Sequence, residues 1–263
     1  MPAPRTYRCE GLTLRKSTMG EADLLITFFT KEQGKVRAVA KGARRATSKL
    51  VGHLEPLTQG RFSMSTGKSL DYINQVQIIN SFSAIKSDLA AVTKGLYVAE
   101  LVDGFGVEAN PNSALFNLAV DTLLAIQNSS ESEWPLRFFE IHLLAVSGLM
   151  PELYWCVECN QELSPGEHRF SPSLGGTLCL NCLPENAYIR PLSLRALKVL
   201  RLIHRGAIAE LMPLNVDGHL AEELKSLTGG TVSYWLEREI RSKSFLDQIQ
   251  RETRGQVYTR CRN

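Results

Sequence analysis

Cys156-Val157-Glu158-Cys159 and Cys179-Leu180-Asn181-Cys182 are the two stretches on which the fold of this sequence depends. In each stretch a tight turn places two thiolates on one side of the backbone. Two such turns that face each other supply four sulfurs at the tetrahedral spacing that suits Zn²⁺. The alternatives are two disulfides or buried free thiols, and the spacing favours zinc, one ion per chain. Because all four positions are cysteine, no coordination place is open, and we expect a structural metal.

The composition is that of a globular protein. Its 263 residues suffice for one large domain or two ordinary ones, and 44% of them are hydrophobic and 22% charged. No run of 18 apolar residues is present, and residues 1–7 lack the apolar region of a signal peptide. Outside the two cysteine pairs only Cys9 and Cys261 remain, which indicates a reducing compartment. We therefore expect a cytoplasmic protein without a membrane segment.

Positive charge is concentrated at the start of the chain. The formal net charge is +3, but residues 1–80 contain 13 Lys and Arg against 6 Asp and Glu, a net charge of +7. The remaining residues, 81–263, have a net charge of −4. A basic domain beside a near-neutral body indicates a polyanionic partner.

Residues 1–80 follow the two-residue period of β-strands. Between Gly34, which can adopt the positive φ of a hairpin loop, and Gly42, apolar residues alternate with Lys35, Arg37 and Lys41. Five strand-like runs in about 75 residues, without a long helix, predict a small closed barrel.

From about residue 81 the period becomes that of α-helices. The expected helices lie at about 85–104, 115–126, 134–147, 194–204, 218–227 and 231–249. The last two should be separated at Gly229-Gly230. The predicted fold class is α+β, with three parts. These are a barrel at 1–80, a helical domain at 81–250 with the zinc module inserted at about 154–184, and a basic, disordered tail at 251–263.

No catalytic arrangement is recognisable in the sequence. The five histidines are scattered, glycine-rich phosphate-binding motifs are absent, and the carboxylates show no paired spacing. We interpret these groups as solvated surface residues and expect a protein that is not an enzyme and has no catalytic residues.

The densest positive charge lies between Lys31 and Lys49, where seven cations occur in nineteen residues with Glu32 as the one acid. A strip of fixed cations matches the regular phosphates of a nucleic acid and releases counterions on binding. The alternative is a cationic face kept for solubility. The candidate DNA-binding residues are Lys35, Arg37, Lys41, Arg44, Arg45 and Lys49.

Aromatic residues of the same region have two interpretations. Phe28, Phe29, Phe62 and Tyr72 could stack on bases, as in single-strand-binding barrels, or belong to the barrel core. No helix with base-reading side chains is recognisable, so we expect binding through the backbone, without sequence preference.

Several short motifs, in their order along the chain, resemble those of the RecO family. They are Gly34-Lys35-Val36, Lys41-Gly42-Ala43-Arg44-Arg45, Leu54-Glu55-Pro56-Leu57, Arg137-Phe138-Phe139-Glu140, Gly148-Leu149-Met150-Pro151, Phe170-Ser171-Pro172 and Leu236-Glu237-Arg238-Glu239-Ile240. The resemblance covers nearly the whole chain. It implies an N-terminal OB-fold, a helical C-terminal domain and a zinc module. Some members of the family lack the four cysteines, which fits a structural metal.

The resemblance also implies a function in DNA repair and recombination, at the nucleoid. Members of the family bind single- and double-stranded DNA, anneal complementary strands and act with RecR, and in many bacteria RecF. Together they place RecA on DNA coated by the single-strand-binding protein SSB. The family docks the acidic SSB C-terminal tail on the helical domain. Candidate contacts here are Arg195, Lys198, Arg201 and Arg205. The alternative for these four residues is a solvated helix face.

Two other classes of function stay open at this point. A zinc-ribbon enzyme that processes nucleic acids would need an open metal site or a carboxylate cluster. A protein-only scaffold would not bind DNA at all.

Overall fold

The computed structural model describes residues 6–48, 50–185 and 187–249. The chain divides into two compact units, one made of residues 1–131 with 240–263 and the other of residues 132–239. The predicted tail at 251–263 lies outside the described residues. Within the described ranges, no helix is long and apolar enough to cross a membrane.

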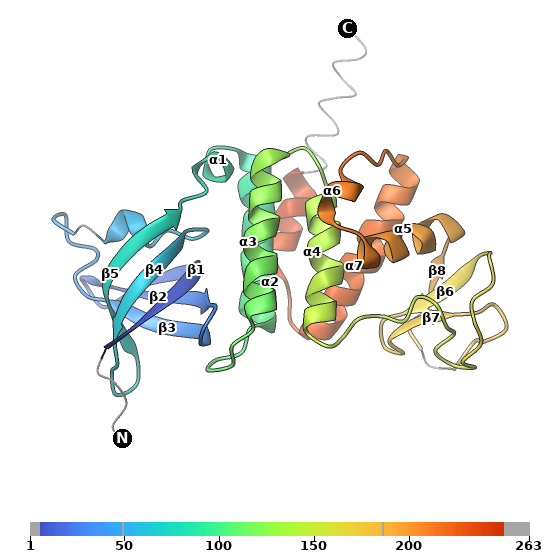
Figure 1. Ribbon diagram of the computed structural model, residues 1–263, viewed down its shortest axis with the longest axis horizontal. Helices are drawn as coiled ribbons and strands as arrows, with labels where there is room; N and C mark the ends of the chain where they lie inside the picture. Colours follow the sequence, from blue (N-terminus) through green and yellow to red (C-terminus); the bar gives the residue numbers. More distant parts are fainter. Residues whose placement is uncertain (1–5, 49, 186, 250–263) are drawn as a thin grey trace, which may run out of the picture. The chain divides into compact units, whose positions relative to one another are not determined.

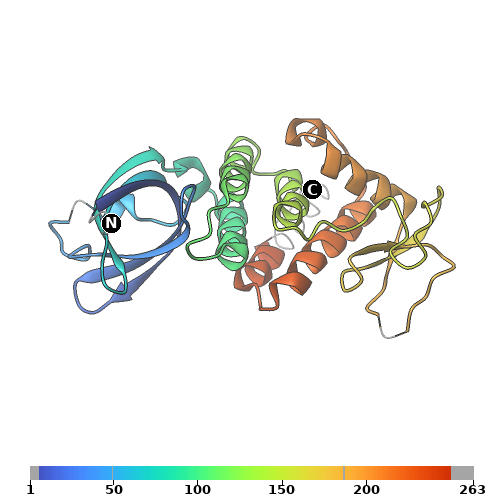
Figure 2. The ribbon, with the colours of Figure 1, turned by 60° about the horizontal axis from the view of Figure 1, so that its bottom comes forward.

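The first unit begins with a closed five-stranded barrel (Figures 1 and 2). Its strands are β1 (Thr6–Met19), β2 (Asp23–Thr30), β3 (Gly34–Ala40), β4 (Gln59–Ser65) and β5 (Asp71–Asn80). The strand order is β1-β2-β3-β5-β4, β4 closes on β1, and β3 pairs with β5 in parallel while the other neighbours are antiparallel. This is the five-stranded barrel of the OB-fold, as expected.

The alternation predicted for β3 holds at Arg37, which is exposed, but not at Val39, which is buried like its two neighbours. Ala38 and Ala40 are completely buried in the barrel core together with Phe28 and Phe62, whose rings stack with centroids 4.6 Å apart. Phe29 is also buried, with 1% of its surface exposed. These three aromatic rings therefore belong to the core and are not available for base stacking.

Two features of position 34 require a glycine, namely its backbone conformation and the close approach of another segment. Its φ of +69° is in the left-handed region that favours glycine, and an added Cβ would lie 2.2 Å from the carbonyl oxygen of Asn110. The next residue, Lys35, donates its backbone N–H to Val107 O at 3.0 Å. The β2–β3 hairpin is thus fixed against residues 107–110.

Helices complete the first unit. They are η1 (Val51–His53), α1 (Ser83–Lys86), α2 (Leu89–Phe105), α3 (Ser113–Asn128) and a helical stretch at residues 241–249. The side chain of Asp88 caps α2 by accepting from Ala91 N–H. Helix α2 packs on the barrel where Gly95 leaves room for Leu57, whose Cδ1 would lie 2.7 Å from an added Cβ.

The second unit is built from four helices and a small sheet (Figure 1). The helices are α4 (Trp134–Val146), α5 (Leu194–Arg205), α6 (Ile208–Leu211) and α7 (Gly218–Leu236). The sheet has the order β7-β6-β8, made of β6 (His168–Ser171), β7 (Gly176–Leu178) and β8 (Arg190–Leu192). Ser193 caps α5, with its hydroxyl accepting from Ala196 N–H.

The predicted break at Gly229-Gly230 is wrong, because α7 continues through both glycines. An added Cβ on Gly230 would lie 2.8 Å from Nη1 of Arg190, which donates to the backbone and side-chain oxygens of Ser226 at 2.7 Å. The glycine therefore makes space for Arg190 beside the helix. The helix ends instead at Glu237, which has a φ of +53°, and a new helical stretch occupies residues 241–249.

A buried ion pair within α4 is hydrogen-bonded to α7. Nη1 of Arg137 lies 2.7 Å from Oε2 of Glu140 and donates to Oγ1 of Thr228 at 2.9 Å. The two charged side chains are 5% and 1% exposed.

Candidate metal centre and nucleic-acid interface

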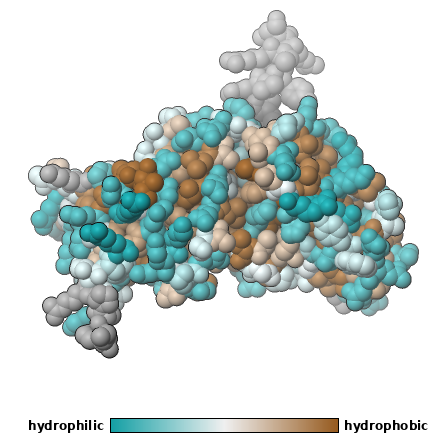
Figure 3. All heavy atoms as spheres, viewed as in Figure 1, coloured by the Kyte–Doolittle hydropathy of each residue, from teal (hydrophilic) through white to brown (hydrophobic). Residues whose placement is uncertain are grey.

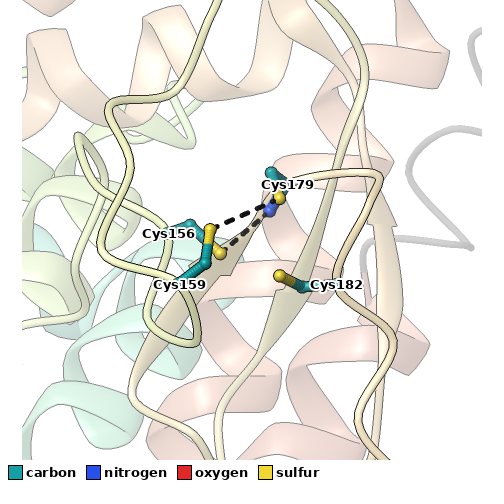
Figure 4. Close-up of side chains that lie close together, drawn as sticks. All are labelled: Cys156, Cys159, Cys179 and Cys182. Carbon is teal, nitrogen blue, oxygen red and sulfur yellow. Dashed lines mark hydrogen bonds between the residues drawn. The ribbon is translucent and has the colours of Figure 1, made fainter.

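The four predicted cysteine ligands converge in the second unit (Figure 4). Their sulfur atoms all lie within 4.8 Å of one another. Cys156 is buried, Cys159 is exposed, and Cys179 and Cys182 are half-buried. The two C-x-x-C turns therefore face each other as the spacing predicts.

The distances distinguish a metal site from disulfides. Sγ of Cys159 lies 3.8 Å from Sγ of Cys179. A tetrahedral Zn–S bond of about 2.3 Å requires neighbouring sulfurs at about 3.8 Å, whereas a disulfide holds them at about 2.0 Å. The five cysteines that the structure describes are all free. The four sulfurs can hold one metal ion with no coordination position left for substrate.

Backbone N–H groups stabilise the thiolate form of Cys156. Burial acts to raise the pKa of Cys156, but N–H groups of residues 159, 179 and 158 donate to its sulfur and lower the pKa to about 6. The contact from Cys179 N–H measures 3.3 Å. Because metals bind thiolates rather than thiols, this lowered pKa suits Cys156 to the role of a ligand, whereas the contact with the Cys179 sulfur raises the pKa of Cys182 to about 12.

Each C-x-x-C turn is held by residues other than the four cysteines. Asn160, with a φ of +55°, donates its N–H to Cys156 O at 2.9 Å and closes the first turn. Arg169 of β6 donates from Nη1 to Leu180 O at 2.7 Å and to Cys182 O at 3.4 Å, which fixes the second turn. Nothing in the local sequence pattern of Arg169 distinguishes it from a surface arginine, so only the structure reveals this role. Since β8 pairs with β6, the module also extends beyond residue 184.

Most of the candidate DNA-binding residues lie on the barrel surface. Arg37, Lys41, Arg44 and Arg45, hereafter the basic strip, are all exposed. Lys49 lies outside the described residues. The strip therefore presents four cations from β3 and the loop that follows it.

Lys35 differs from the strip. Its Nζ donates to the backbone oxygen of Asp103 at 2.7 Å and lies 3.6 Å from Oδ1 of the same residue, near the end of α2. Only 18% of its side chain is exposed. Lys35 thus ties the barrel to α2 and is less accessible to a phosphate than the strip.

The loop that contains the strip is ordered by the β1–β2 hairpin. Arg44 donates from Nη1 to the carbonyl oxygens of Gly20 and Glu21 at 3.2 and 3.0 Å. Gly42 N–H donates to Oδ1 of Asp23 at 2.7 Å. Nζ of Lys41 lies 4.4 Å from the ring centroid of Tyr72, a cation–π contact. These contacts fix the cations on a rigid support.

Helix α5 carries the four candidate contacts for a partner. Arg195 pairs with Asp217 at 2.6 Å, and both side chains are at least half exposed. Arg201 donates to Leu153 O at 2.8 Å and stacks on Tyr154, while Nε of Arg205 reaches Arg201 O at 3.4 Å. Lys198 is exposed. Arg195 and Arg201 thus have partners within the unit, and the docking of an acidic tail here stays a prediction.

Comparison with known proteins identifies the family. The model of the recombination protein O N-terminal domain matches residues 3–82, and that of its C-terminal domain matches residues 86–244. The chain belongs to the RecO family. Its change from barrel to helices at β5 coincides with the boundary between the two family domains.

Relatives of known family are similar in sequence to this chain over nearly its full length. A DNA repair protein RecO of Dehalococcoides mccartyi (strain ATCC BAA-2266 / KCTC 15142 / 195) is 34% identical over 251 residues, which cover 95% of this chain and 99% of that protein. The RecO of Roseiflexus sp. (strain RS-1) is 35% identical over 95% of this chain and 88% of its own length. That of Desulforamulus reducens is 32% identical, with 95% and 98% coverage.

Proposed function

We propose that this protein is a DNA repair and recombination mediator. In this proposal it binds single- and double-stranded DNA without sequence preference and anneals complementary strands. With RecR, and RecF where that protein is present, it helps to load RecA onto DNA coated by SSB. It acts in the cytoplasm at the nucleoid and is not an enzyme.

The observation that carries the proposal is the basic strip on a closed OB-type barrel in a chain of the RecO family. Its four exposed cations sit on a support fixed by Gly20, Glu21 and Asp23. Cations on a rigid surface contact phosphates, which carry no sequence information. The strip therefore supports binding that depends on salt and not on sequence.

The proposed mechanism is physical and not covalent. Annealing requires two polyanionic strands to approach each other despite their mutual repulsion. A cationic barrel lowers that repulsion and raises the local concentration of strands, while contacts limited to phosphates leave base edges free to pair.

The cysteine module has a supporting part in this proposal. Zn²⁺ held by Cys156, Cys159, Cys179 and Cys182 would supply stability to a segment too short to build its own core. The exposed face of α5 is the proposed landing site for the acidic SSB tail.

Binding and annealing assays test the proposal. Affinity should be measured for several unrelated DNA sequences at low and physiological salt, and the annealing rate for complementary oligonucleotides with and without protein. We expect similar affinities across sequences, a steep decline with salt and faster annealing. Absence of DNA binding at low salt would favour a protein-only scaffold, and turnover of labelled nucleic acid that chelation abolishes would favour a zinc-ribbon enzyme.

A further inference from the structure

The barrel has a second feature suited to a polyanion, a groove of about 610 Å³ whose lining includes no residue of the basic strip. Its walls come from β1, from the segment between β3 and β4, and from β4 and β5. The lining residues are Arg8, Leu50, His53, Arg61, Phe62, Ser63, Asn74, Gln75, Val76 and Gln77. The volume is within the range of ligand-binding clefts.

The strand register places the two arginines of the groove on one face. Arg8 of β1 lies opposite Ser63 of β4, and Glu10 lies opposite Arg61, so Arg8 and Arg61 are diagonal neighbours. Phe62, between Arg61 and Ser63, points into the core, so the arginines point outward. Diagonal neighbours are about 7–8 Å apart, close enough to contact successive phosphates of one strand.

Both guanidinium groups are available to a ligand. Arg8 and Arg61 are exposed, and neither side chain has a hydrogen bond or ion pair with any residue that the structure describes. The lining contains no carboxylate. The acidic neighbour in the register, Glu10, accepts from Nε2 of Gln59 at 2.8 Å. A concave surface lined by charge of one sign concentrates anions.

The rest of the lining fits a nucleotide strand better than a simple anion. Gln75 and Gln77 of β5 lie in line with Ser63 and Arg61 across the sheet, so their amides share the outer face. Amides donate and accept hydrogen bonds and can meet base edges. His53 adds a half-buried ring at one wall, which can stack on a base. In the view of Figure 3, the barrel surface carries strongly hydrophilic side chains beside an apolar patch.

We propose that this groove is a second binding site for single-stranded DNA, occupied while the basic strip holds the first strand. The inference rests on the proposed function and deepens it. Two strands on one barrel would raise the rate at which complementary bases meet, whereas a single site could hold only one partner of the pair.

Energy transfer between two unpaired strands tests the second site. Donor-labelled and acceptor-labelled oligothymidylates, which cannot pair, are mixed with the full-length protein, and annealing of complementary strands is measured in parallel. The test variant is Arg8→Gln with Arg61→Gln. The matched control is Arg15→Gln with Lys68→Gln, which removes two exposed cations of the same barrel outside the groove lining.

We expect the wild-type protein and the control variant to give energy transfer. The groove variant should give none, and its annealing rate should be about tenfold lower. The groove variant should keep its affinity for the first strand within about twofold. For binding of the second strand, the plot of log K against log salt should become less steep by about 1.4. This is the change expected when two phosphate contacts on a single strand are lost.

Other outcomes separate the two proposals. Unchanged energy transfer and annealing in the groove variant would overturn the second site and leave the proposed function intact. The same holds if the groove variant loses only the binding of an aspartate-rich peptide, because the groove would then be a peptide site. Failure of the wild-type protein to bind DNA would instead overturn the proposed function.

Discussion

The cysteine module and the basic strip arrange their side chains in opposite ways. In the module, four sulfurs from two distant turns converge within 4.8 Å. In the strip, four cations from one continuous segment stay exposed. A metal ion requires convergence because its bonds are short and directed, whereas a polyphosphate requires cations spread along a surface. The difference fits the proposed function, in which the module stabilises the fold and the strip contacts DNA.

The largest expected effect comes from the loss of one sulfur ligand. Cys179→Ser should abolish stoichiometric metal binding and lower the Tm of the second unit by more than about 10 °C, because the metal contributes an apparent 10–16 kcal/mol of binding free energy in comparable modules, about the size of a whole domain's stability. The affinity for DNA should change by less than about twofold. Metal analysis, calorimetry and DNA titration measure the three quantities.

Cys9→Ala is the matched control, because Cys9 is a buried thiol of the barrel core and not a ligand. It should retain one metal ion per chain. Less than half an equivalent of metal in freshly purified wild-type protein would contradict the four-sulfur site.

Within the second unit, loss of a buried ion pair should cost more unfolding free energy than loss of an exposed one. Glu140→Ala leaves Arg137 buried without its carboxylate and should cost about 3–5 kcal/mol of unfolding free energy. Arg195→Ala removes one member of an exposed pair and should cost less than about 1 kcal/mol. Denaturant unfolding of the two variants measures both values, and equal costs would refute the contrast.

Removal of two cations from the basic strip should weaken DNA binding, and loss of the Arg44 contacts with Gly20 O and Glu21 O should also loosen the loop. Arg44→Ala with Arg45→Ala should weaken binding to unrelated duplexes alike and reduce the salt slope by about 2, one unit for each phosphate contact. The same charge removed at Arg15 and Lys68 serves as the control. If the Arg44/Arg45 variant has an unchanged affinity and slope, the assignment of this loop is wrong.

The smallest effect concerns the support of the strip. A double-mutant cycle of Lys41→Ala and Tyr72→Leu should give a coupling energy of about 0.5–1 kcal/mol, the value of an exposed cation–π contact. Urea unfolding of the two single variants and the double variant measures it. A coupling near zero would show that Lys41 is positioned by the backbone alone.

Local patterns predicted most of the fold correctly. The strand-like runs of residues 1–80 formed the barrel, and the four helices with clear periodicity formed within a few residues of their expected bounds. The error at Gly229-Gly230 has a tertiary origin. Glycine usually interrupts a helix because it lowers helix propensity, but the contact with Arg190 depends on a strand that is distant in sequence.

The sequence by itself determined which four cysteines converge, the sign and density of the charge on the barrel, and the strand-like runs that form it. Spacing and period are local properties, so they can be read along the chain. Only the tertiary structure showed that Lys35 is held by Asp103, that Arg169 fixes the second cysteine turn, and that Arg8 and Arg61 share a groove. These features depend on which distant segments meet, and long-range contacts leave no period in the sequence.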